Sequence, residues 1–258
     1  TSASQTLNAG DNINGGAGAD TLNITSTSLL AAGTGVTSTG FETVSVTATG
    51  GNFSLDATTM TGITAITNSG STGADVTVTG LTAKIAVNLT GNNNSTTITH
   101  AATAVAGTAD TLALTLNGAN TTTAGTLLVN GFETINAAAT GATGSSTQSL
   151  TISDDSLQTL AITGAGASNI TATLSGAGGA VVGTVTGGDG AETLTITPGS
   201  SALLSISTNA GNDRVNISAI AATHTIAGGD GTDTLDLSGT YTYVAATSTV
   251  EATNPWAN

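Results

Sequence analysis

The chain has 258 residues, of which 35 are glycine, 7% are charged and only 2% are aromatic. Sixteen acidic residues against two basic ones give a formal net charge of −14, which excludes an ordinary nucleic-acid binder, because such proteins need Lys and Arg to contact phosphates. No apolar run approaches the roughly 18–20 residues of a membrane-spanning helix. Since 38% of the residues are hydrophobic, disorder is not expected; the core should be thin and repetitive.

Short stretches of alternating polar and apolar residues recur along the whole chain. They are rich in β-branched residues and bounded by Gly, Asn or Asp, which is typical of strands. No long segment has the 3.6-residue spacing of an amphipathic helix. The sequence therefore predicts an all-β fold, with strands at 21–25, 43–49, 76–81, 111–118, 149–153, 193–197 and 234–238.

Four nine-residue segments share the frame G-G-x-G-x-D-x-U-x, in which U is a large aliphatic residue. They are GGAGADTLN (15–23), GGDGAETLT (187–195), TNAGNDRVN (208–216) and GGDGTDTLD (228–236). Weaker copies at 6–14, 70–78 and 105–113 keep Asp11, Asp75 and Asp110, and another at 163–171 has Ser168 at the acidic position.

A longer repeat overlies the short one, since 16–50 resembles 106–141 and each contains the tetrapeptide Gly-Phe-Glu-Thr. Its glutamates, Glu42 and Glu133, fall at the acidic position of the frame. Glutamate is longer than aspartate, so metal ligation and a structural role within a solenoid turn are equally open for both. Phe41 and Phe132 are expected to fill the core.

The frame suits calcium chemistry. Glycine allows positive φ and close backbone approach, so a Gly-rich turn can direct its carbonyls inward. Ca²⁺ takes six to eight oxygen ligands from carboxylates and carbonyls, while the U residue of the following strand points into the core. The candidate calcium ligands are Asp11, Gly16, Gly18, Asp20, Asp75, Asp110, Gly188, Asp189, Gly190, Glu192, Asn209, Gly211, Asp213, Gly229, Asp230, Gly231 and Asp233.

This frame resembles the nonapeptide of the RTX ("repeats in toxin") family, in which tandem copies form a parallel β-roll with calcium between turns. Here the clear motifs start at 187, 208 and 228, which is about one solenoid turn apart. The resemblance therefore implies an irregular right-handed parallel β-solenoid (β-helix) with RTX-type calcium-binding turns. Calcium ions would lie between Glu192 and Asp213, and between Asp213 and Asp233. Asp230 and Asp236 should point outward or contact the calcium ligands rather than the ion itself.

The wider Thr-, Ala-, Gly- and Ser-rich texture, with GGAGADTL and two GFET segments, resembles calcium-dependent surface-layer (S-layer) proteins of Gram-negative bacteria. That resemblance implies type I secretion, location at the cell surface, calcium-driven folding and self-assembly into a lattice, with cell-surface polysaccharide as a further candidate partner. The expected organisation is a first solenoid module at 1–104, a second at 105–236 with calcium-binding turns at 187–236, and the start of a further module or a C-terminal tail at 237–258.

A lattice protein has three alternatives, of which an adhesin is the main one. An RTX adhesin segment would bind a surface or carbohydrate ligand. An enzyme is not expected, because the sequence has neither a G-x-S-x-G elbow nor a P-loop. An ice-binding solenoid is disfavoured because the Thr-x-Thr triplets show no fixed register. Asp56, Asp154 and Asp155 are expected in Asx-turns, and His100 and His224 on the surface.

Overall fold

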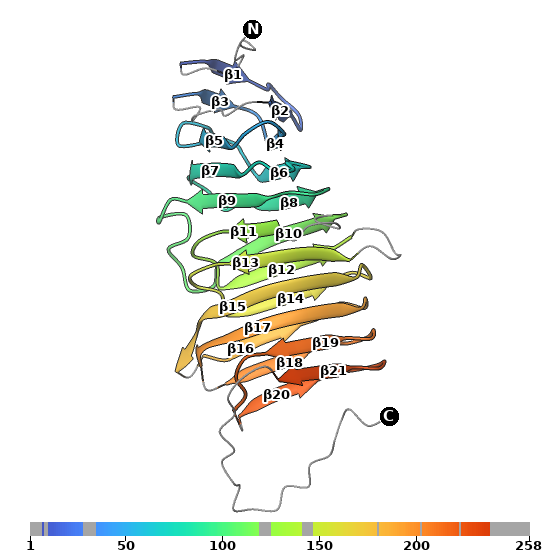
Figure 1. The fold of residues 1–258 in the computed structure, drawn as a ribbon. Helices are drawn as coiled ribbons and strands as arrows, with labels where there is room; N and C mark the ends of the chain where they lie inside the picture. The colour runs from blue at the N-terminus through green and yellow to red at the C-terminus, as the bar shows by residue number, and fades with distance from the viewer. Residues whose placement is uncertain are drawn as a thin grey trace, which may run out of the picture.

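The protein is an elongated β-solenoid of about nine turns in the computed structural model (Figure 1). The structure describes residue 7 and residues 10–27, 35–118, 125–140, 147–179, 181–201, 203–221 and 223–237. All strand pairs are parallel, and no helix appears in the described ranges. The expected all-β parallel solenoid is thus confirmed, and each of the seven strands predicted from the sequence coincides with an observed one.

Two long parallel sheets form the walls of the solenoid, and the chain alternates between them. The first sheet runs in the order β2 (Thr21–Ser26), β4 (Thr43–Ala48), β6 (Ala65–Ser69), β8 (Ala86–Thr90), β10 (Thr111–Asn117), β12 (Thr134–Ala139), β14 (Thr159–Thr163), β16 (Gly183–Thr186), β18 (Leu204–Ser207) and β20 (His224–Ala227). The second sheet runs in the order β5 (Phe53–Asp56), β7 (Val76–Leu81), β9 (Ser95–His100), β11 (Gly125–Leu128), β13 (Gln148–Ser153), β15 (Ser168–Gly179), β17 (Glu192–Ser201), β19 (Arg214–Ile217) and β21 (Thr234–Leu237).

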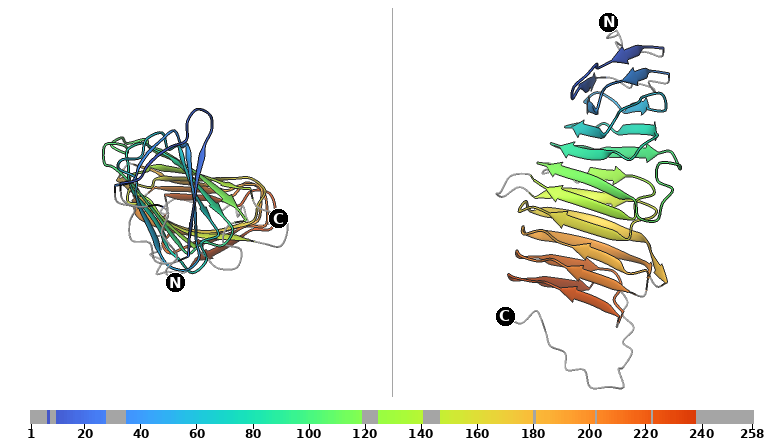
Figure 2. Two further views of the ribbon diagram at one scale, coloured as in Figure 1. Left: turned by 90° about the horizontal axis from the view of Figure 1, so that it is seen from above. Right: turned by 180° about the vertical axis from the view of Figure 1, so that it is seen from behind.

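The N-terminal turns have a third, shorter wall. It consists of β1 (Asn12–Asn14) and β3 (Thr37–Thr39), and an isolated bridge between Ser38 and Met60 continues it by one turn. The view along the axis accordingly shows a broader outline for the N-terminal turns than for the C-terminal ones (Figure 2).

The core is a single apolar column between the two sheets. Side chains of successive strand residues point to opposite faces, and strands such as β4, β6 and β8 alternate strictly between half-buried and buried positions. Val, Leu and Ile fill the interior, with two fully buried aromatic residues, Phe53 and Phe132. Phe132 is therefore a core residue as expected, whereas Phe41 is only half-buried.

Threonines on the outer faces stand in fixed columns, but these are columns of single threonines and not of the Thr-x-Thr triplets that ice binding would need. Strand pairing aligns four of them on consecutive strands of the second sheet: Thr126, Thr151, Thr171 and Thr195. A column on the first sheet contains Thr111, Thr134, Thr159, Thr184, Ser205 and Thr225. The register was hidden in the sequence because loops of different lengths separate the strands.

Both sheets continue across the expected boundary between residues 104 and 105. On the first sheet β8 pairs with β10, and on the second β9 pairs with β11. The two modules therefore share one stack of strands and one core. Of the expected third segment at 237–258, only residue 237 lies in the part of the chain that the structure describes. Within that part no helix is long and apolar enough to cross a membrane.

Candidate metal-binding turns

Three acidic residues stack on one edge of the solenoid, where the chain passes from the first sheet to the second. Glu192, Asp213 and Asp233 occupy the same register position on consecutive turns, since the strands that follow them pair residue for residue. The Glu192 N–H donates to Asp213 Oδ1 at 2.8 Å, and the Asp213 N–H donates to Asp233 Oδ1 at 3.0 Å. We call these three residues the acid column. The structure thus brings together the acids that the motif spacing placed on one corner.

Two members of the acid column, Glu192 and Asp213, are buried and incompletely paired, whereas Asp233 is half-buried. Glu192 is 1% exposed and Asp213 is 2% exposed. Neither carboxylate oxygen of Glu192, nor Asp213 Oδ2, has a hydrogen-bond partner among the described residues. A buried charge without a partner is costly, so the column favours either protonation or a bound cation.

Burial and mutual repulsion raise the pKa values of two acids in the column, Glu192 and Asp213. Burial, followed by repulsion from Asp213, raises the pKa of Glu192 to about 8. Burial likewise raises the pKa of Asp213 above its usual range, although the Glu192 N–H opposes this shift. The protein alone therefore holds Glu192 largely protonated at neutral pH, and a cation would have to displace that proton.

The turns before the acid column are packed backbone against backbone. Gly211 and Gly231 both have φ of +136°, and Asn209 and Gly229 have φ of +64° and +89°. A Cβ on Gly231 would overlap the carbonyl oxygen of Gly211, which lies one turn earlier. Glycine is therefore required at this position both for its φ and for the close stacking of the turns, which lines the edge with carbonyl oxygens.

The column continues toward the N-terminus with neutral residues. Ser168 lies in register with Glu192, and Gln148 lies in register with Ser168. Both are buried, and the Ser168 hydroxyl has no partner among the described residues. On the two turns before Glu192, this row is therefore uncharged. The sequence had already shown Ser168 at the acidic position, but it gave no sign that Gln148 belongs to the same row.

Asp20 occupies a turn of the same conformation near the other end of the solenoid, on the opposite edge. Gly16 and Gly18 have φ of +97° and +129°, close to the values at Gly229 and Gly231. The Asp20 N–H donates to Glu42 Oε2 at 2.8 Å, while Asp20 Oδ2 is buried without a partner among the described residues. The motif at 15–23 thus forms the same kind of turn as the motif at 228–236.

The two glutamates of the longer repeat have equivalent contacts. Glu133 Oε2 accepts a hydrogen bond of 2.7 Å from the Asp110 N–H, as Glu42 does from Asp20. Each glutamate therefore ties its own turn to the preceding one, which is the structural role that the sequence left open.

Asp110 already has a cation from the protein. Lys84 Nζ lies 2.7 Å from Asp110 Oδ1, and the Gly107 N–H donates to Oδ2 at 3.0 Å. The hydrogen bond from Lys84 holds the pKa of Asp110 below its usual range. Both carboxylate oxygens of Asp110 are occupied. The metal ligation predicted for Asp110 would therefore have to displace Lys84 or the Gly107 N–H. The 26-residue separation of this pair, about one turn, was the available sequence signal.

Asp75 is held by neutral donors rather than by a cation. Asn94 Nδ2 and the Ser95 N–H donate to its Oδ1, and Asn52 Nδ2 donates to its Oδ2. Asn52, Asp75 and Asn94 directly precede β5, β7 and β9, so they form a polar ladder at the edge of the second sheet. The sequence did not single out the two asparagines.

The remaining predicted acids lie outside the column. The Asp189 and Asp230 side chains are exposed, and the Asp230 backbone bonds to Asn209 and Gly211 of the turn before it. Asp236 pairs with Arg214 on the outer face, so Asp230 and Asp236 point outward as expected.

Asp11 is half-buried in the N-terminal turn, where its carbonyl accepts from the Thr37 N–H. Of the predicted glycines, Gly188 and Gly190 stack on carbonyls of the 164–166 turn.

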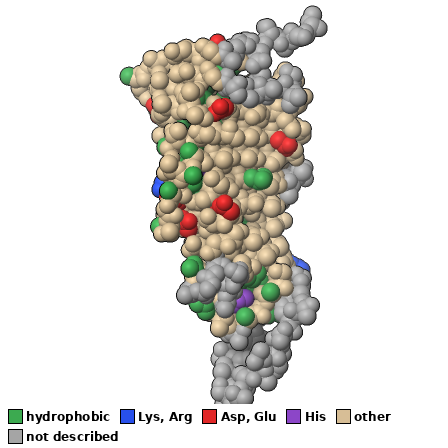
Figure 3. All heavy atoms as spheres, turned by 90° about the vertical axis from the view of Figure 1, so that its left-hand side faces the viewer, with side chains coloured by type: hydrophobic (Ala, Val, Ile, Leu, Met, Phe, Trp, Pro, Cys, Tyr) green, Lys and Arg blue, Asp and Glu red, His purple; other side chains and the backbone are tan. Residues whose placement is uncertain are grey.

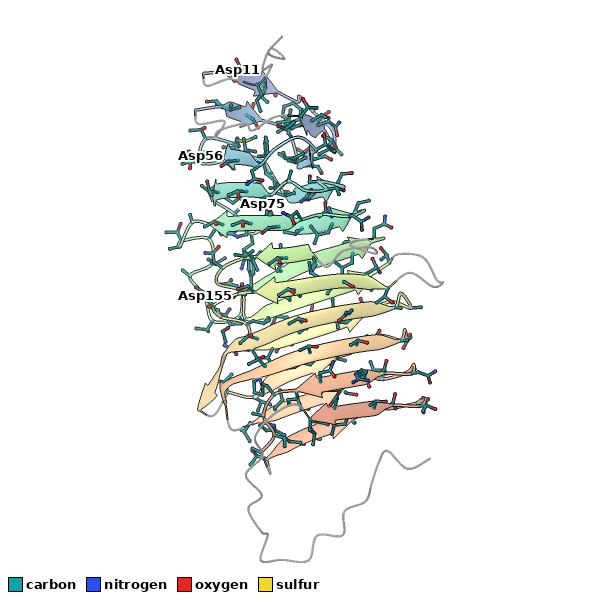
Figure 4. The ribbon with its side chains drawn as sticks, viewed as in Figure 1. Asp11, Asp56, Asp75 and Asp155 are labelled. Carbon is teal, nitrogen blue, oxygen red and sulfur yellow. The ribbon has the colours of Figure 1, made fainter. Side chains whose placement is uncertain are left out.

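Two of the three predicted Asx-turn residues, Asp56 and Asp154, have the expected turn contact. Asp56 Oδ1 accepts from the Thr58 N–H, and Asp154 Oδ1 accepts from the Ser156 N–H. Asp155 bonds instead to the Gly131 N–H of the previous turn. Asp56 and Asp155 lie along the same edge of the solenoid in Figure 4. These aspartates are therefore structural.

His100 is not on the surface, contrary to the prediction. It is 3% exposed, and its ring packs edge-on against Phe132 at a centroid distance of 5.0 Å. Neither ring nitrogen has a hydrogen-bond partner among the described residues. Burial lowers the pKa of His100 to about 4. His100 ends strand β9 at an inward position, and its isolation in the sequence concealed this. His224 is half-buried.

In the described residues no three His, Cys, Asp or Glu side chains converge closely enough to hold a metal alone. A cation at the acid column would therefore need several backbone carbonyl ligands, as the glycine turns can supply. Calcium suits such a site because it accepts six to eight oxygens in flexible geometry.

Comparisons with protein-family models, with curated proteins and with solved structures found no match for this chain. The inference of function therefore depends on the sequence motifs and on the geometry of these turns.

Proposed function

We propose that this chain is a structural extracellular protein whose solenoid binds calcium at its glycine turns and self-assembles into a surface layer. Calcium would bridge consecutive turns at the acid column and at Asp20, and so stabilise both the fold and the contacts between copies. The protein would act as a building block of the bacterial cell surface rather than as an enzyme.

The single observation that carries this proposal is the buried stack of Glu192 over Asp213, with three carboxylate oxygens lacking partners. Two acids in contact at a buried position destabilise the protein unless a proton or a cation neutralises them. The adjacent turns offer closely stacked carbonyls, and hard cations prefer oxygen ligands. These features together support a divalent cation between the turns.

Self-assembly is supported by the character of the surface. Figure 3 shows a face on which most atoms belong to neutral polar side chains or backbone, with only scattered acidic groups. A net charge of −14 keeps copies apart, and bound divalent cations would reduce that repulsion. Association would then depend on calcium.

The test combines calcium calorimetry with microscopy of the same sample. We expect saturable calcium binding, followed by ordered sheets or filaments that dissolve when a chelator is added. A monodisperse monomer at saturating calcium and high protein concentration would contradict the assembly part. Absence of any calcium binding at millimolar concentration would contradict the whole proposal.

A second candidate is an adhesin segment that binds a surface or carbohydrate ligand through its outer sheets. It is favoured by the threonine columns, because they present regular rows of hydroxyls on both faces. This candidate predicts the same calcium-stabilised monomer without ordered assembly. Replacing Thr151, Thr171 and Thr195 with valine should then abolish adhesion to a polysaccharide-coated surface while leaving calcium binding intact.

A further inference from the structure

We propose that calcium acts only at the two ends of the solenoid and that the middle folds without it, so that the calcium concentration sets how many turns are formed. The identity of the cation rests on the function proposed above. The division into a self-sufficient middle and cation-dependent ends comes from how each acid is partnered.

In the middle of the solenoid the protein itself supplies a partner to every acidic side chain that the structure places near a turn. Asp75 has two asparagines and a backbone N–H, and Asp110 has Lys84 and the Gly107 N–H. Asp154 accepts from the Ser156 and Phe132 backbone N–H groups. Asp56 and Asp155 accept from Thr58 and Gly131. Each of these acidic side chains thus has a hydrogen-bond donor from the protein itself.

At both ends the pattern is different. Asp20 Oδ2 near the N-terminal end, and the Glu192 and Asp213 oxygens toward the C-terminal end, are buried without partners among the described residues. Both ends also carry turns with positive φ: Gly16 and Gly18 precede Asp20, and Asn209 and Gly211 precede Asp213. Thus the unpartnered carboxylates coincide with the turns whose backbone can supply further oxygens.

Lys84 indicates what replaces the cation in the middle. Its ammonium group contacts Asp110, which, like Asp20, directly precedes a strand of the first sheet. A positive side chain from the preceding turn thus neutralises the acid there. In the acid column, by contrast, the nearest described basic group, Arg214, points outward and pairs with Asp236.

The packing follows the same division. Phe132 is fully buried in the middle, whereas Ile226 and Leu235 in the last described turn are only partly buried. In a solenoid each turn contacts only its neighbours, so terminal turns gain least from packing and open most readily. A cation at these turns would add stability where the apolar core contributes least.

Hydrogen exchange of the intact chain, with saturating calcium and with a chelator, tests the proposal when calorimetry follows the same samples. We expect amides of β2 and of β17–β21 to exchange at least about tenfold faster in chelator, while amides of β7–β14 keep their protection. Two outcomes would overturn this proposal while leaving calcium binding intact. In one, the chelator lowers protection equally along the whole chain; in the other, it lowers protection nowhere, although calorimetry shows that calcium binds. Failure to bind calcium would overturn both.

A matched variant separates the two ends. The double substitution Glu192→Gln and Asp213→Asn keeps side-chain size but removes the two buried charges. We expect β17–β21 to become insensitive to calcium, while β2 keeps its response through Asp20. If β17–β21 of this variant still gained protection with calcium as in the unmodified chain, the acid column would not be the responsible site. Asp75→Asn is the control, and it should leave both responses unchanged.

Discussion

The carboxylate of Asp213 accepts a hydrogen bond from the backbone N–H of Glu192, which lies one solenoid turn earlier. The same relationship joins Asp233 to Asp213, Glu133 to Asp110 and Glu42 to Asp20. In each case one carboxylate oxygen fixes the preceding turn, and the other oxygen is left for a different partner. The identity of that second partner distinguishes a structural turn from a candidate metal-binding turn.

Asp213 should serve the turns on both sides of it, so its removal should lower calcium capacity more than the removal of any acid in an Asx-turn. We expect Asp213→Asn to lose about one ion or more per chain by calorimetric titration, since Ca²⁺ depends on carboxylate ligands. Asp56→Asn is the control, because the Asp56 carboxylate accepts hydrogen bonds from Thr58 in an exposed turn. Equal stoichiometry in the two variants would rule out the acid column as the binding site.

Without calcium, raising the pH should destabilise the protein through Glu192. Its pKa is raised to about 8 in the folded state, against 4.5 ordinarily, so the folded protein binds the extra proton. The corresponding stability is complete below pH 4.5 and is lost as the pH rises toward 8. Denaturation in chelator at pH 5 and pH 8.5 should show this loss, and Glu192→Gln should remove most of it. A variant with the same pH dependence as the unmodified chain would argue against this assignment.

His100 should make the protein sensitive to acid. Because burial lowers its pKa to about 4 from 6.5, the folded state keeps the imidazole neutral, and stability is lost as the pH falls from 6.5 toward 4. We expect a loss of roughly 1–2 kcal/mol between pH 7 and pH 5 from this group. His100→Leu should reduce the difference by that amount in denaturant melts, and His224→Gln should change it much less.

Gly176 should tolerate no side chain. A Cβ there would overlap the Ser156 carbonyl oxygen of the previous turn, so Gly176→Ala should destabilise by about 3 kcal/mol or more through overpacking. Gly70 also has a special conformation, with φ of +68°, but no atom lies within 4 Å of its Cβ position. Gly70→Ala should therefore cost only about 1 kcal/mol. Thermal or denaturant unfolding of both variants measures the difference.

Much of the fold could be predicted from the sequence, because strand alternation and turn conformation depend on residues that are close together in the chain. Alternation in segments such as 43–49 and 193–197 fixed strands with one inward face. The nonapeptide frame identified the turns at Asp20, Asp213 and Asp233, since the required glycine conformations appear directly in the sequence. The 20- and 21-residue intervals between motifs also predicted the vertical order of the acid column.

The partners of each acid were not readable, because they lie one turn away along loops of variable length. Asp110 and Asp20 look alike in the frame, yet Lys84 neutralises only Asp110, from 26 residues earlier. His100 is an isolated histidine in the sequence, yet its position at the end of β9 buries it against Phe132.

The sequence by itself thus determined an all-β solenoid with glycine turns and acidic positions, because alternation and φ requirements act within a few residues. Only the tertiary structure decided which carboxylates remain unpartnered. Burial and charge neutralisation depend on the residues that stack above and below, and the stacking register is set by the pairing of strands about 20 to 30 residues apart.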